Sequence, residues 1–308
     1  MPEATLTVAP PSAPAEERLT PIGQALTILG DRWVLMILQR AFLLHVRTFA
    51  GWRDELGISE SVLASRLKEL VACGIFETAA YRNGRIRYEY RLTQRGLDLW
   101  SLLVAIYSWE RDWTDRELPP LIHDVCGHES RPVLGCGHCL NVMTARGTHT
   151  VRGPNATFAS AHAPRRHRRT AGPRPDYLGY CPDAMEILGD RWSTHVLAAA
   201  FLGVKRFGDF QAEMGIAPSV LTDRLRRFVD LGVFRPCESG YRLTERGLAF
   251  FEVFAFLVAW AQRELPTPPG STLDITHKSC GAGLAPVLLC TACGGVLARR
   301  EVHFDISA

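Results

Sequence analysis

Apolar residues recur at helical spacing in three stretches between residues 31 and 72. The first helix is expected to begin after Asp31, whose carboxylate can accept hydrogen bonds from the backbone N–H groups of the first turn. The second is short and is expected to end at Gly57, because glycine takes the left-handed backbone that ends many helices. The third begins near Ser59, and its buried stripe consists of Val62, Leu63, Leu67 and Leu70.

The pattern changes to strand-like alternation in residues 76–92, on both sides of Asn83 and Gly84. This dipeptide is the strongest short signal for a tight hairpin. Thr93 can then cap a long helix, whose apolar positions are Leu97, Trp100, Leu103, Ile106, Tyr107 and Trp113. Three helices, a hairpin and a helix make a winged helix-turn-helix, whose third helix usually enters the DNA major groove.

The chain contains this pattern twice. "ILGDRW" occurs at residues 28–33 and again at 187–192. "GISESVLASRLKELVACGIF" (57–76) corresponds to "GIAPSVLTDRLRRFVDLGVF" (215–234), and "YRLTQRGLDLW" (90–100) to "YRLTERGLAFF" (241–251). A third block, "IHDVCGHESRPVLGCGHC" (122–139), corresponds to "THKSCGAGLAPVLLCTAC" (276–293). Because the period is a domain length, we interpret the chain as a tandem duplication and not a solenoid.

Both copies resemble the HxlR-type winged helix regulators of bacteria. In copy two the resemblance is carried by "CPDAMEILGDRW", "KRFGDF", the block 215–234 and "YRLTERG". Copy one departs by a residue inserted before Phe49 and by Ile22 where copy two has Cys181. Members of this family are homodimers joined through terminal helices. The resemblance therefore implies a transcriptional regulator in which the two copies form an intramolecular pseudo-dimer, and it leaves a further homodimer open.

The expected fold class is mainly α with small β-hairpins (α+β), with two winged helix-turn-helix domains in tandem, each followed by a small zinc-ribbon-like module. The chain has 308 residues, 47% of them hydrophobic, which is enough for two hydrophobic cores. The predicted boundaries are a disordered tail at 1–19, winged helix domains at 20–118 and 177–265, zinc-binding modules at 119–150 and 266–308, and a linker at 151–176. The linker composition already begins at residue 147, since Gly, Pro, Ser and Arg fill 147–175 without apolar periodicity.

The sequence shows no signal peptide pattern and no uninterrupted apolar run of membrane-spanning length. We therefore expect a soluble cytoplasmic protein, associated with the nucleoid and not with a membrane. The net charge is only +3, so affinity for double-stranded DNA has to come from local clusters of charge. No nucleophilic triad, His-Glu-x-x-His or phosphate-binding glycine motif is present, so an enzyme is not expected.

A helix that contacts DNA needs short polar side chains at the bases and cations at the phosphates. The third helix of copy one offers Ser59, Ser61, Ser65, Arg66 and Lys68. The corresponding helix of copy two offers Ser219, Thr222, Asp223, Arg224, Arg226 and Arg227. The alternative is that these residues form only the solvated face of an amphipathic helix. If both helices contact bases, their different residues predict an imperfect palindrome.

The two hairpins differ in charge. Arg82, Arg85 and Arg87 surround the tip of the first hairpin, where they could contact phosphates or the minor groove. The second hairpin, "PCESGYRL", is shorter and lacks such a cluster, so the two halves are expected to bind DNA unequally. The run "RRHRR" (165–169) is a solvated charge run or a DNA-backbone contact.

Nine cysteines in a cytoplasmic chain favour metal or redox chemistry over disulfides. Six of them belong to a motif, His-x2-Cys-x9-Cys-x2-Cys, that occurs once in each copy. We expect two structural zinc sites per chain, each formed within one copy: His123, Cys126, Cys136 and Cys139, and His277, Cys280, Cys290 and Cys293. His128 or His138 could replace His123, but copy two has no counterpart of either. Four protein ligands leave no open position for catalysis.

Cys181 precedes Pro182 at an expected helix start, where the helix dipole would lower the pKa of its thiol. Some HxlR-type regulators sense oxidants or electrophiles through a cysteine near this position, so the resemblance implies a redox sensor; the alternative is a capping or core residue. Cys73 is expected to be a small buried apolar residue, and Cys237 has no assigned role.

A protein-interaction module without direct DNA contact is the second function that we consider, since the net charge is modest. Loss of salt-sensitive DNA binding would favour it. A small-molecule effector is left open. Its pocket would lie among aromatic residues that could equally be core or dimer seam, namely Trp100, Trp109, Phe254 and Trp260.

Overall fold

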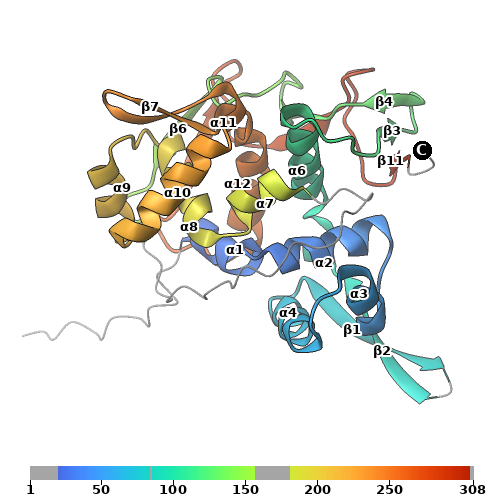
Figure 1. Cartoon of the computed structure of the whole chain (residues 1–308). Helices are drawn as coiled ribbons and strands as arrows, with labels where there is room; N and C mark the ends of the chain where they lie inside the picture. Colours follow the sequence, from blue (N-terminus) through green and yellow to red (C-terminus); the bar gives the residue numbers. More distant parts are fainter. Residues whose placement is uncertain (1–19, 84, 157–180, 306–308) are drawn as a thin grey trace, which may run out of the picture.

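The computed structural model describes residues 20–83, 85–156 and 181–305 (Figure 1). In repeat 1 the helices and strands are α1 (Pro21–Leu29), α2 (Arg32–Leu43), α3 (Phe49–Leu56), α4 (Glu60–Ala72), β1 (Phe76–Asn83), β2 (Arg85–Leu92), α5 (Gln94–Leu97) and α6 (Trp100–Trp113). In repeat 2 they are α7 (Pro182–Leu188), α8 (Arg191–Phe201), α9 (Phe207–Met214), α10 (Pro218–Asp230), β7 (Phe234–Cys237), β8 (Gly240–Leu243), α11 (Glu245–Ala249) and α12 (Phe251–Glu264). The mixed fold with two winged helix-turn-helix units is confirmed.

Two details of repeat 1 differ from the expectation. An additional helix, α1, precedes the helix capped by Asp31; Thr20, whose hydroxyl accepts a hydrogen bond from the Gly23 N–H, and Pro21 are the signals for its start. The long helix expected after Thr93 is divided into α5 and α6. Among the described residues, no helix combines the length and the apolar character that a membrane span requires.

The segments after α6 and α12 form strands that pair across the two repeats. Repeat 1 contributes β3 (Leu121–His123), β4 (His128–Ser130), β5 (Val133–Cys136) and β6 (Thr148–Arg152), and repeat 2 contributes β9 (Leu273–His277), β10 (Pro286–Leu289) and β11 (Val302–Phe304). The antiparallel pairs β6·β9, β3·β11 and β5·β10 each join one strand from each repeat.

The pairing of strands from different repeats bears on two expectations. The two C-terminal modules are not separate, because each contains strands of both repeats. Strand β6 occupies the first part of the segment 147–175, whose composition indicates a linker, and it extends to Arg152, inside the predicted linker at 151–176. The rest of that segment from residue 157, the run 165–169 and the tail 1–19 lie outside the described residues. Strand β6 was missed because its partner, β9, lies in the other half of the chain, where local sequence patterns give no information about pairing.

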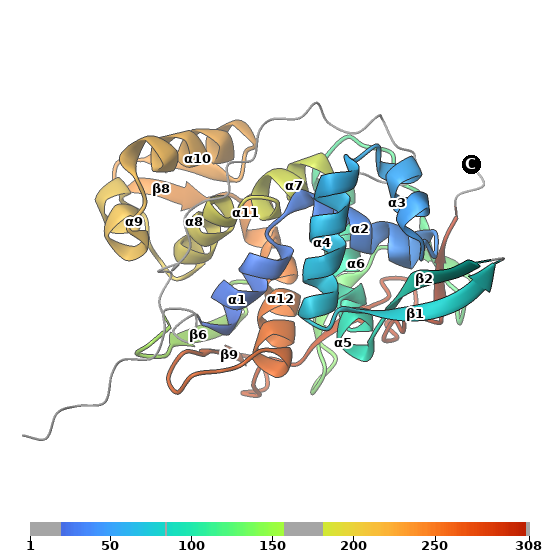
Figure 2. The same ribbon diagram turned by 90° about the horizontal axis from the view of Figure 1, so that it is seen from below.

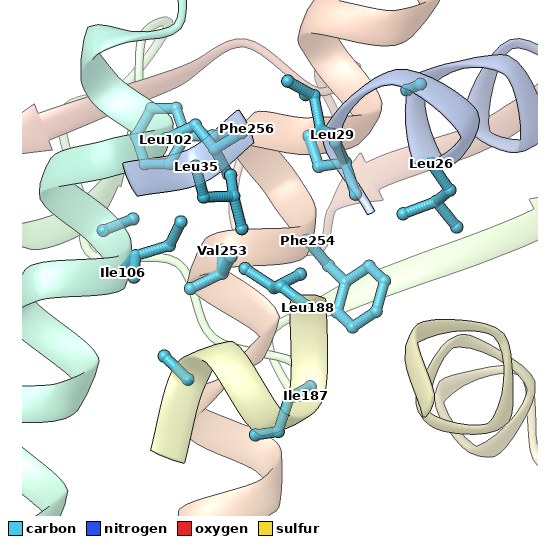
Figure 3. Packing of buried hydrophobic residues seen from close by; sticks show 14 of the residues in the cluster. Leu26, Leu29, Leu35, Leu102, Ile106, Ile187, Leu188, Val253, Phe254 and Phe256 are labelled. Carbon is cyan, nitrogen blue, oxygen red and sulfur yellow. The ribbon is translucent and has the colours of Figure 1, made fainter. Parts of the chain in front are cut away.

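The core of the molecule lies between the repeats. Helix α12 packs against α1 and α6, and α6 also packs against α7. Figure 3 shows apolar side chains of these helices pointing toward one another, among them Leu26, Ile106, Leu188 and Phe254. In both views the helix-turn-helix units, with α3 and α4 in one and α9 and α10 in the other, lie on different sides of this helical centre (Figures 1 and 2). The two repeats therefore share one continuous core.

Reciprocal hydrogen bonds reinforce this interface. The indole N–H of Trp109 donates to the carbonyl oxygen of Arg246 over 3.0 Å, and the indole N–H of Trp260 donates to that of Arg95 over 3.1 Å. Both indoles are buried. Because Trp109 and Trp260 occupy corresponding positions in "YSWERDW" and "LVAWAQRE", the same contact is made in both directions across an approximate twofold relation.

The duplicated hexapeptide lies at this twofold relation. Asp31 and Asp190 form an isolated antiparallel bridge to each other through their backbones. Each carboxylate caps its own helix, with N–H donors at 2.9 Å from Trp33 and 2.8 Å from Trp192. The second carboxylate oxygen of Asp31 accepts from Arg66 of α4, and that of Asp190 pairs with Arg224 of α10. The hexapeptide thus joins the repeats to each other and fixes α4 and α10 to the core.

Glu110 of α6 has no exposed surface and lies at the start of α7 in the other repeat. Its two carboxylate oxygens accept hydrogen bonds from the backbone N–H groups of Asp183 (3.3 Å) and Ala184 (2.9 Å). Burial is the largest influence and raises the pKa of Glu110 to about 7, although the helix N–H groups oppose this shift. A buried carboxyl group therefore joins the two repeats and titrates near neutral pH.

Replacing Asp31 with Ala should lower the free energy of unfolding by about 2–3 kcal/mol, because the variant loses a helix cap and leaves the half-buried Arg66 without its main carboxylate partner. The shift in the urea midpoint measures this loss. Asp54→Ala, which removes an exposed carboxylate paired with Arg53, is the control and should shift the midpoint little. Equal shifts for the two variants would contradict the role of Asp31.

Replacing Glu110 with Gln should flatten the pH dependence of stability between about pH 5 and pH 7. The folded-state pKa of about 7 lies above the usual 4.5, so the folded chain holds this proton longer and loses stability as pH rises through that window. Glu252, whose pKa burial also raises to about 7, contributes in the same direction and remains in the variant. Thermal unfolding of wild type, Glu110→Gln and the exposed control Glu117→Gln tests this; identical pH profiles for all three would contradict it.

Candidate nucleic-acid interface and metal clusters

The polar faces of α4 and α10 divide into an exposed set and a paired set. The exposed residues are Ser59, Ser61, Ser65 and Lys68 in repeat 1, and Ser219, Thr222 and Arg226 in repeat 2. Lys68 and Arg226 stand at corresponding positions, and the Arg226 side chain is 71% exposed. Apart from Ser59, which precedes α4, these residues lie on one face of each helix, although Arg226 also pairs with Asp223 and Ser65 with Glu69.

The paired set makes contacts within the protein. Arg66 is only 11% exposed and pairs with Asp31, and Arg224 is only 16% exposed and pairs with Asp190 and Asp223. Arg227 pairs with Glu186 and with Asp223, which leaves Asp223 surrounded by three arginines. The guanidinium groups of Arg66 and Arg224 therefore attach α4 and α10 to the helix caps, and contact of either residue with DNA stays a prediction.

The hairpins differ as the sequence indicates. Strands β1 and β2 pair over their whole length, up to Asn83 opposite Arg85 at the tip, and Arg82 lies opposite Ile86. The backbone thus places Arg82 and Arg85 at the tip, and the side chain of Arg87 is exposed. In repeat 2, β7 and β8 are four residues each, and their last pair at the tip is Cys237 opposite Gly240, whose φ of 115° is accessible mainly to glycine.

The eight predicted metal ligands converge in two clusters, but the grouping within each copy is wrong. One cluster consists of His123, Cys126, Cys290 and Cys293, and the other of Cys136, Cys139, His277 and Cys280. In each cluster the donor atoms all lie within 4.8 Å of one another. Each His-x2-Cys pair therefore meets the Cys-x2-Cys pair of the other repeat. The identical spacing in both copies permits either grouping, so the sequence could not distinguish them.

The distances between donor atoms match a tetrahedral metal site. Cys126 Sγ lies 4.0 Å from Cys290 Sγ, and Cys136 Sγ lies 3.8 Å from Cys280 Sγ. The Nδ1 atom of each histidine lies 3.4–3.5 Å from two sulfurs of its cluster. Usual zinc bond lengths to sulfur and nitrogen predict about 3.8 Å between two sulfurs and about 3.5 Å between sulfur and nitrogen. All these cysteines are free thiols, and the sulfurs are too far apart for disulfides.

One cysteine of each cluster has a thiol pKa below the usual value. Burial opposes ionisation of Cys136, but the backbone N–H groups of Cys139 and His138, with His277, outweigh it and lower the pKa of Cys136 to about 6. Burial likewise opposes ionisation of Cys290, but the Ser130 hydroxyl and the N–H groups of Cys293 and Ala292 lower its pKa to about 6. Thiolates at neutral pH are the form in which cysteine binds metals.

The alternative histidines are outside the clusters. His128 Nδ1 lies 2.6 Å from the carbonyl oxygen of Cys126, and His138 is exposed. Among the described residues neither belongs to a group that could hold a metal ion. His123, placed by strand β3, and His277, placed by β9, supply the nitrogen donors of the two clusters, and both histidines are buried.

Of the two interpretations of Cys181, burial favours the core residue over the reactive thiol, and a redox role stays a prediction. Cys181 is only 3% exposed, and burial, followed by the nearby Glu110 carboxyl group, raises the pKa of its thiol well above the usual value. The effect of burial outweighs the dipole of the short helix α7. Cys73 is half-buried, and burial raises its pKa, as expected for a small apolar residue. In Cys237 a hydrogen bond with the Ser239 hydroxyl lowers the thiol pKa.

The aromatic residues of α6 and α12 lie at the interface between the repeats, which favours their interpretation as a dimer seam over their interpretation as an effector pocket. Trp109, Phe254 and Trp260 are buried, and Trp100 packs against the same core. Trp109 also makes an edge contact with Phe250 of the other repeat, with ring centroids 4.9 Å apart. These rings hold the repeats together.

The chain is similar to proteins of a known family. A model of the HxlR-like helix-turn-helix family matches it twice, at residues 28–118 and 187–268. The chain belongs to the HxlR-like helix-turn-helix family. The two matches include both winged helix units and stop before the metal-ligand motifs. The HxlR-like region thus occurs twice, and the resemblance seen in the sequence is confirmed.

Relatives of this HxlR-like chain are named as transcriptional regulators. An uncharacterized HTH-type transcriptional regulator of Mycobacterium tuberculosis is 40% identical over 136 residues, which are 43% of this chain and 85% of the relative. The HTH-type regulator YvaP of Bacillus subtilis is 33% identical over 93 residues, 30% of this chain and 85% of its own length. The crystal structure of PA1607, described as a candidate transcription factor, is 31% identical and covers 38% of this chain and 84% of its own, with a TM-score of 0.35.

The cross-repeat grouping predicts which pairs of cysteines share one metal ion. Cys126→Ser combined with Cys290→Ser damages one cluster and should remove about one equivalent of bound metal per chain. Cys126→Ser combined with Cys139→Ser damages both clusters and should remove about two. Elemental analysis of the purified proteins measures the difference. The opposite result would restore the grouping within each copy, and unchanged metal content in both variants would show that these residues bind none.

Proposed function

We propose that the protein is a sequence-specific regulator that binds double-stranded DNA through α4 and α10, with its two winged helix units acting as an intramolecular pseudo-dimer. The observation that carries this proposal is the pair of exposed polar stripes on α4 and α10, which the Asp31–Arg66 and Asp190–Arg224 contacts hold to a shared core. A helix held in this way has little freedom to lose on binding to a groove.

The unequal halves favour an imperfect palindrome as the operator. Lys68 and Arg226 are equivalent cations, but Thr222 is exposed where repeat 1 has Ala64. The longer hairpin of repeat 1 adds Arg87 and the tip residues Arg82 and Arg85, for which repeat 2 has no counterpart. Repeat 1 should therefore contact a longer stretch of DNA at its half-site than repeat 2 does.

Zinc is the metal that the clusters fit best. Three sulfur donors, one imidazole and near-tetrahedral spacing are typical of closed structural zinc sites. We infer two zinc ions per chain, each bound by both repeats, so that the metal joins the repeats beside the helical core. With four protein ligands in each cluster, the ions serve structure and not catalysis.

One observation keeps a protein-interaction function as the second candidate. Ile86 and Tyr88 on β2 are 67% and 62% exposed, and apolar side chains of this size on a hairpin can bind a protein partner. The two functions differ in salt dependence, since DNA binding releases counterions and weakens steeply as salt rises. A location at the nucleoid and any further homodimer follow from the first function and stay predictions.

Selection from sheared genomic double-stranded DNA, followed by anisotropy titrations over a salt series, tests the proposed function. The expected result is a recurrent imperfect palindrome bound by one chain per site. Weak binding to every fragment, without enrichment, would favour the protein-interaction function.

Lys68→Ala and Arg226→Ala should each weaken binding to the selected operator and reduce the slope of log affinity against log salt by about one, because each removes one phosphate or base contact. Arg300→Ala, an exposed arginine in the module of repeat 2, is the charge-matched control. Arg224→Ala should instead lower the unfolding midpoint, since Arg224 pairs with Asp190. If Lys68→Ala and Arg226→Ala both bind like wild type, the exposed stripes do not contact DNA.

A further inference from the structure

A surface cavity occurs at corresponding places in both repeats. In repeat 2 it measures about 310 Å³ and is lined by Ala200, Val204, Lys205, Tyr241, Arg242 and Leu243. In repeat 1 the cavity measures about 440 Å³ and has Ala41, Val46, Arg47, Tyr90, Arg91 and Leu92 at the corresponding positions. Each cavity lies between the end of α2 or α8, the loop that follows this helix and the base of the hairpin.

The cavity of repeat 1 has two additional side chains that carry nitrogen donors, His45 and Arg299. His45 lines it and has a φ of 52°, a left-handed backbone that is unfavourable for a residue with a side chain. In repeat 2 the residue before Val204 is Gly203, with a φ of 93°. The chain therefore keeps a side chain in repeat 1 at a position where glycine suffices in repeat 2, which is a feature common at functional sites.

The other additional side chain, the cation Arg299, comes from the opposite repeat. It precedes β11, which pairs with β3, and this exchange carries Arg299 to the hairpin base of repeat 1. The corresponding residue of repeat 1 is Ala145, so the cavity of repeat 2 receives no such cation. Only the cavity of repeat 1 is thus formed by both repeats.

The charge of this cavity is only partly neutralised. Arg91 pairs with Glu89 over 2.5 Å, whereas no ion pair of Arg47 or Arg299 is found within the described part of the chain. None of the described residues that line the cavity is acidic. The remaining lining is apolar and includes Phe42, Phe76 and Leu97. Its volume falls within the range of pockets that bind small molecules.

We propose that this cavity binds a small organic acid, with its carboxylate between Arg47, Arg91 and Arg299 and its aromatic or aliphatic body against Phe42, Phe76 and Tyr90. Guanidinium groups recognise carboxylates through paired hydrogen bonds, and the apolar walls supply contact area for the body. Bound acid would connect the hairpin base of repeat 1 to the metal module of repeat 2. Binding does not depend on the proposed function; its use as an effector site rests on that function.

Isothermal titration calorimetry of the full metal-loaded chain with 2-naphthoate at low salt tests the site. The expected result is one binding event per chain, with at least about tenfold weaker binding of the neutral 2-naphthamide, since the amide lacks the charge. Arg299→Ala and Arg47→Ala should each raise the Kd for naphthoate about tenfold, and Arg299→Lys should recover part of the loss. The neighbouring Arg300→Ala, which leaves the cavity lining intact, should bind like wild type.

Three results would overturn the proposal: no heat of binding at millimolar naphthoate, equal binding of acid and amide, or unchanged binding by Arg299→Ala and Arg47→Ala. Thermal unfolding of each variant shows whether it is folded; a loss of naphthoate binding with an unchanged unfolding curve supports the site. If Arg299→Ala weakens operator binding but not naphthoate binding, the arginines contact DNA phosphates instead. If naphthoate binding depends on Arg299 but no operator is found, the ligand site stands and only its regulatory role fails.

Discussion

The burial of apolar surface among α1, α6, α7 and α12 is the interaction on which the rest of the structure depends. These helices come from both repeats, so neither repeat encloses a complete core by itself. Their packing brings Asp31 against Asp190 and aligns β3 with β11 and β6 with β9. The metal clusters and the cavity that contains Arg299 follow from this alignment, because each takes residues from both halves.

The sequence predicts the local structure well, because helix caps, the Asn-Gly turn and apolar periodicity act within one stretch of chain. The caps at Asp31 and Thr93 and the hairpin at residues 83–85 lie where the pattern indicates. The identity of the eight metal ligands is also evident from their repeated spacing. Their grouping and the partner of β6 are not, because both depend on which half of the chain lies opposite. The pairing of Arg66 with Asp31 could not be predicted for a similar reason. A polar residue on an amphipathic helix has the same sequence pattern whether its side chain faces solvent or a buried carboxylate.

The duplication allows the two halves to differ where a homodimer would have to repeat the same residue. Gly135 and Leu289 occupy corresponding positions in "VLGC" and "VLLC", and they meet where β5 pairs with β10. A Cβ atom added to Gly135 would lie 2.4 Å from Cδ1 of Leu289, so a large residue in one half requires a small one in the other. His45 against Gly203 and Arg299 against Ala145 are differences of the same kind, placed at a cavity instead of the seam.

The exchange of ligand pairs also has a consequence for the order in which the protein is made. Cys126 and Cys139 belong to the first repeat, but the clusters that contain them also need Cys290 and Cys293, and His277 and Cys280, from the second repeat. Neither set of four donors can assemble until the second repeat has been synthesised, and metal affinity in sites of this kind is coupled to folding. A chain that ended between the repeats would carry only half of each donor set.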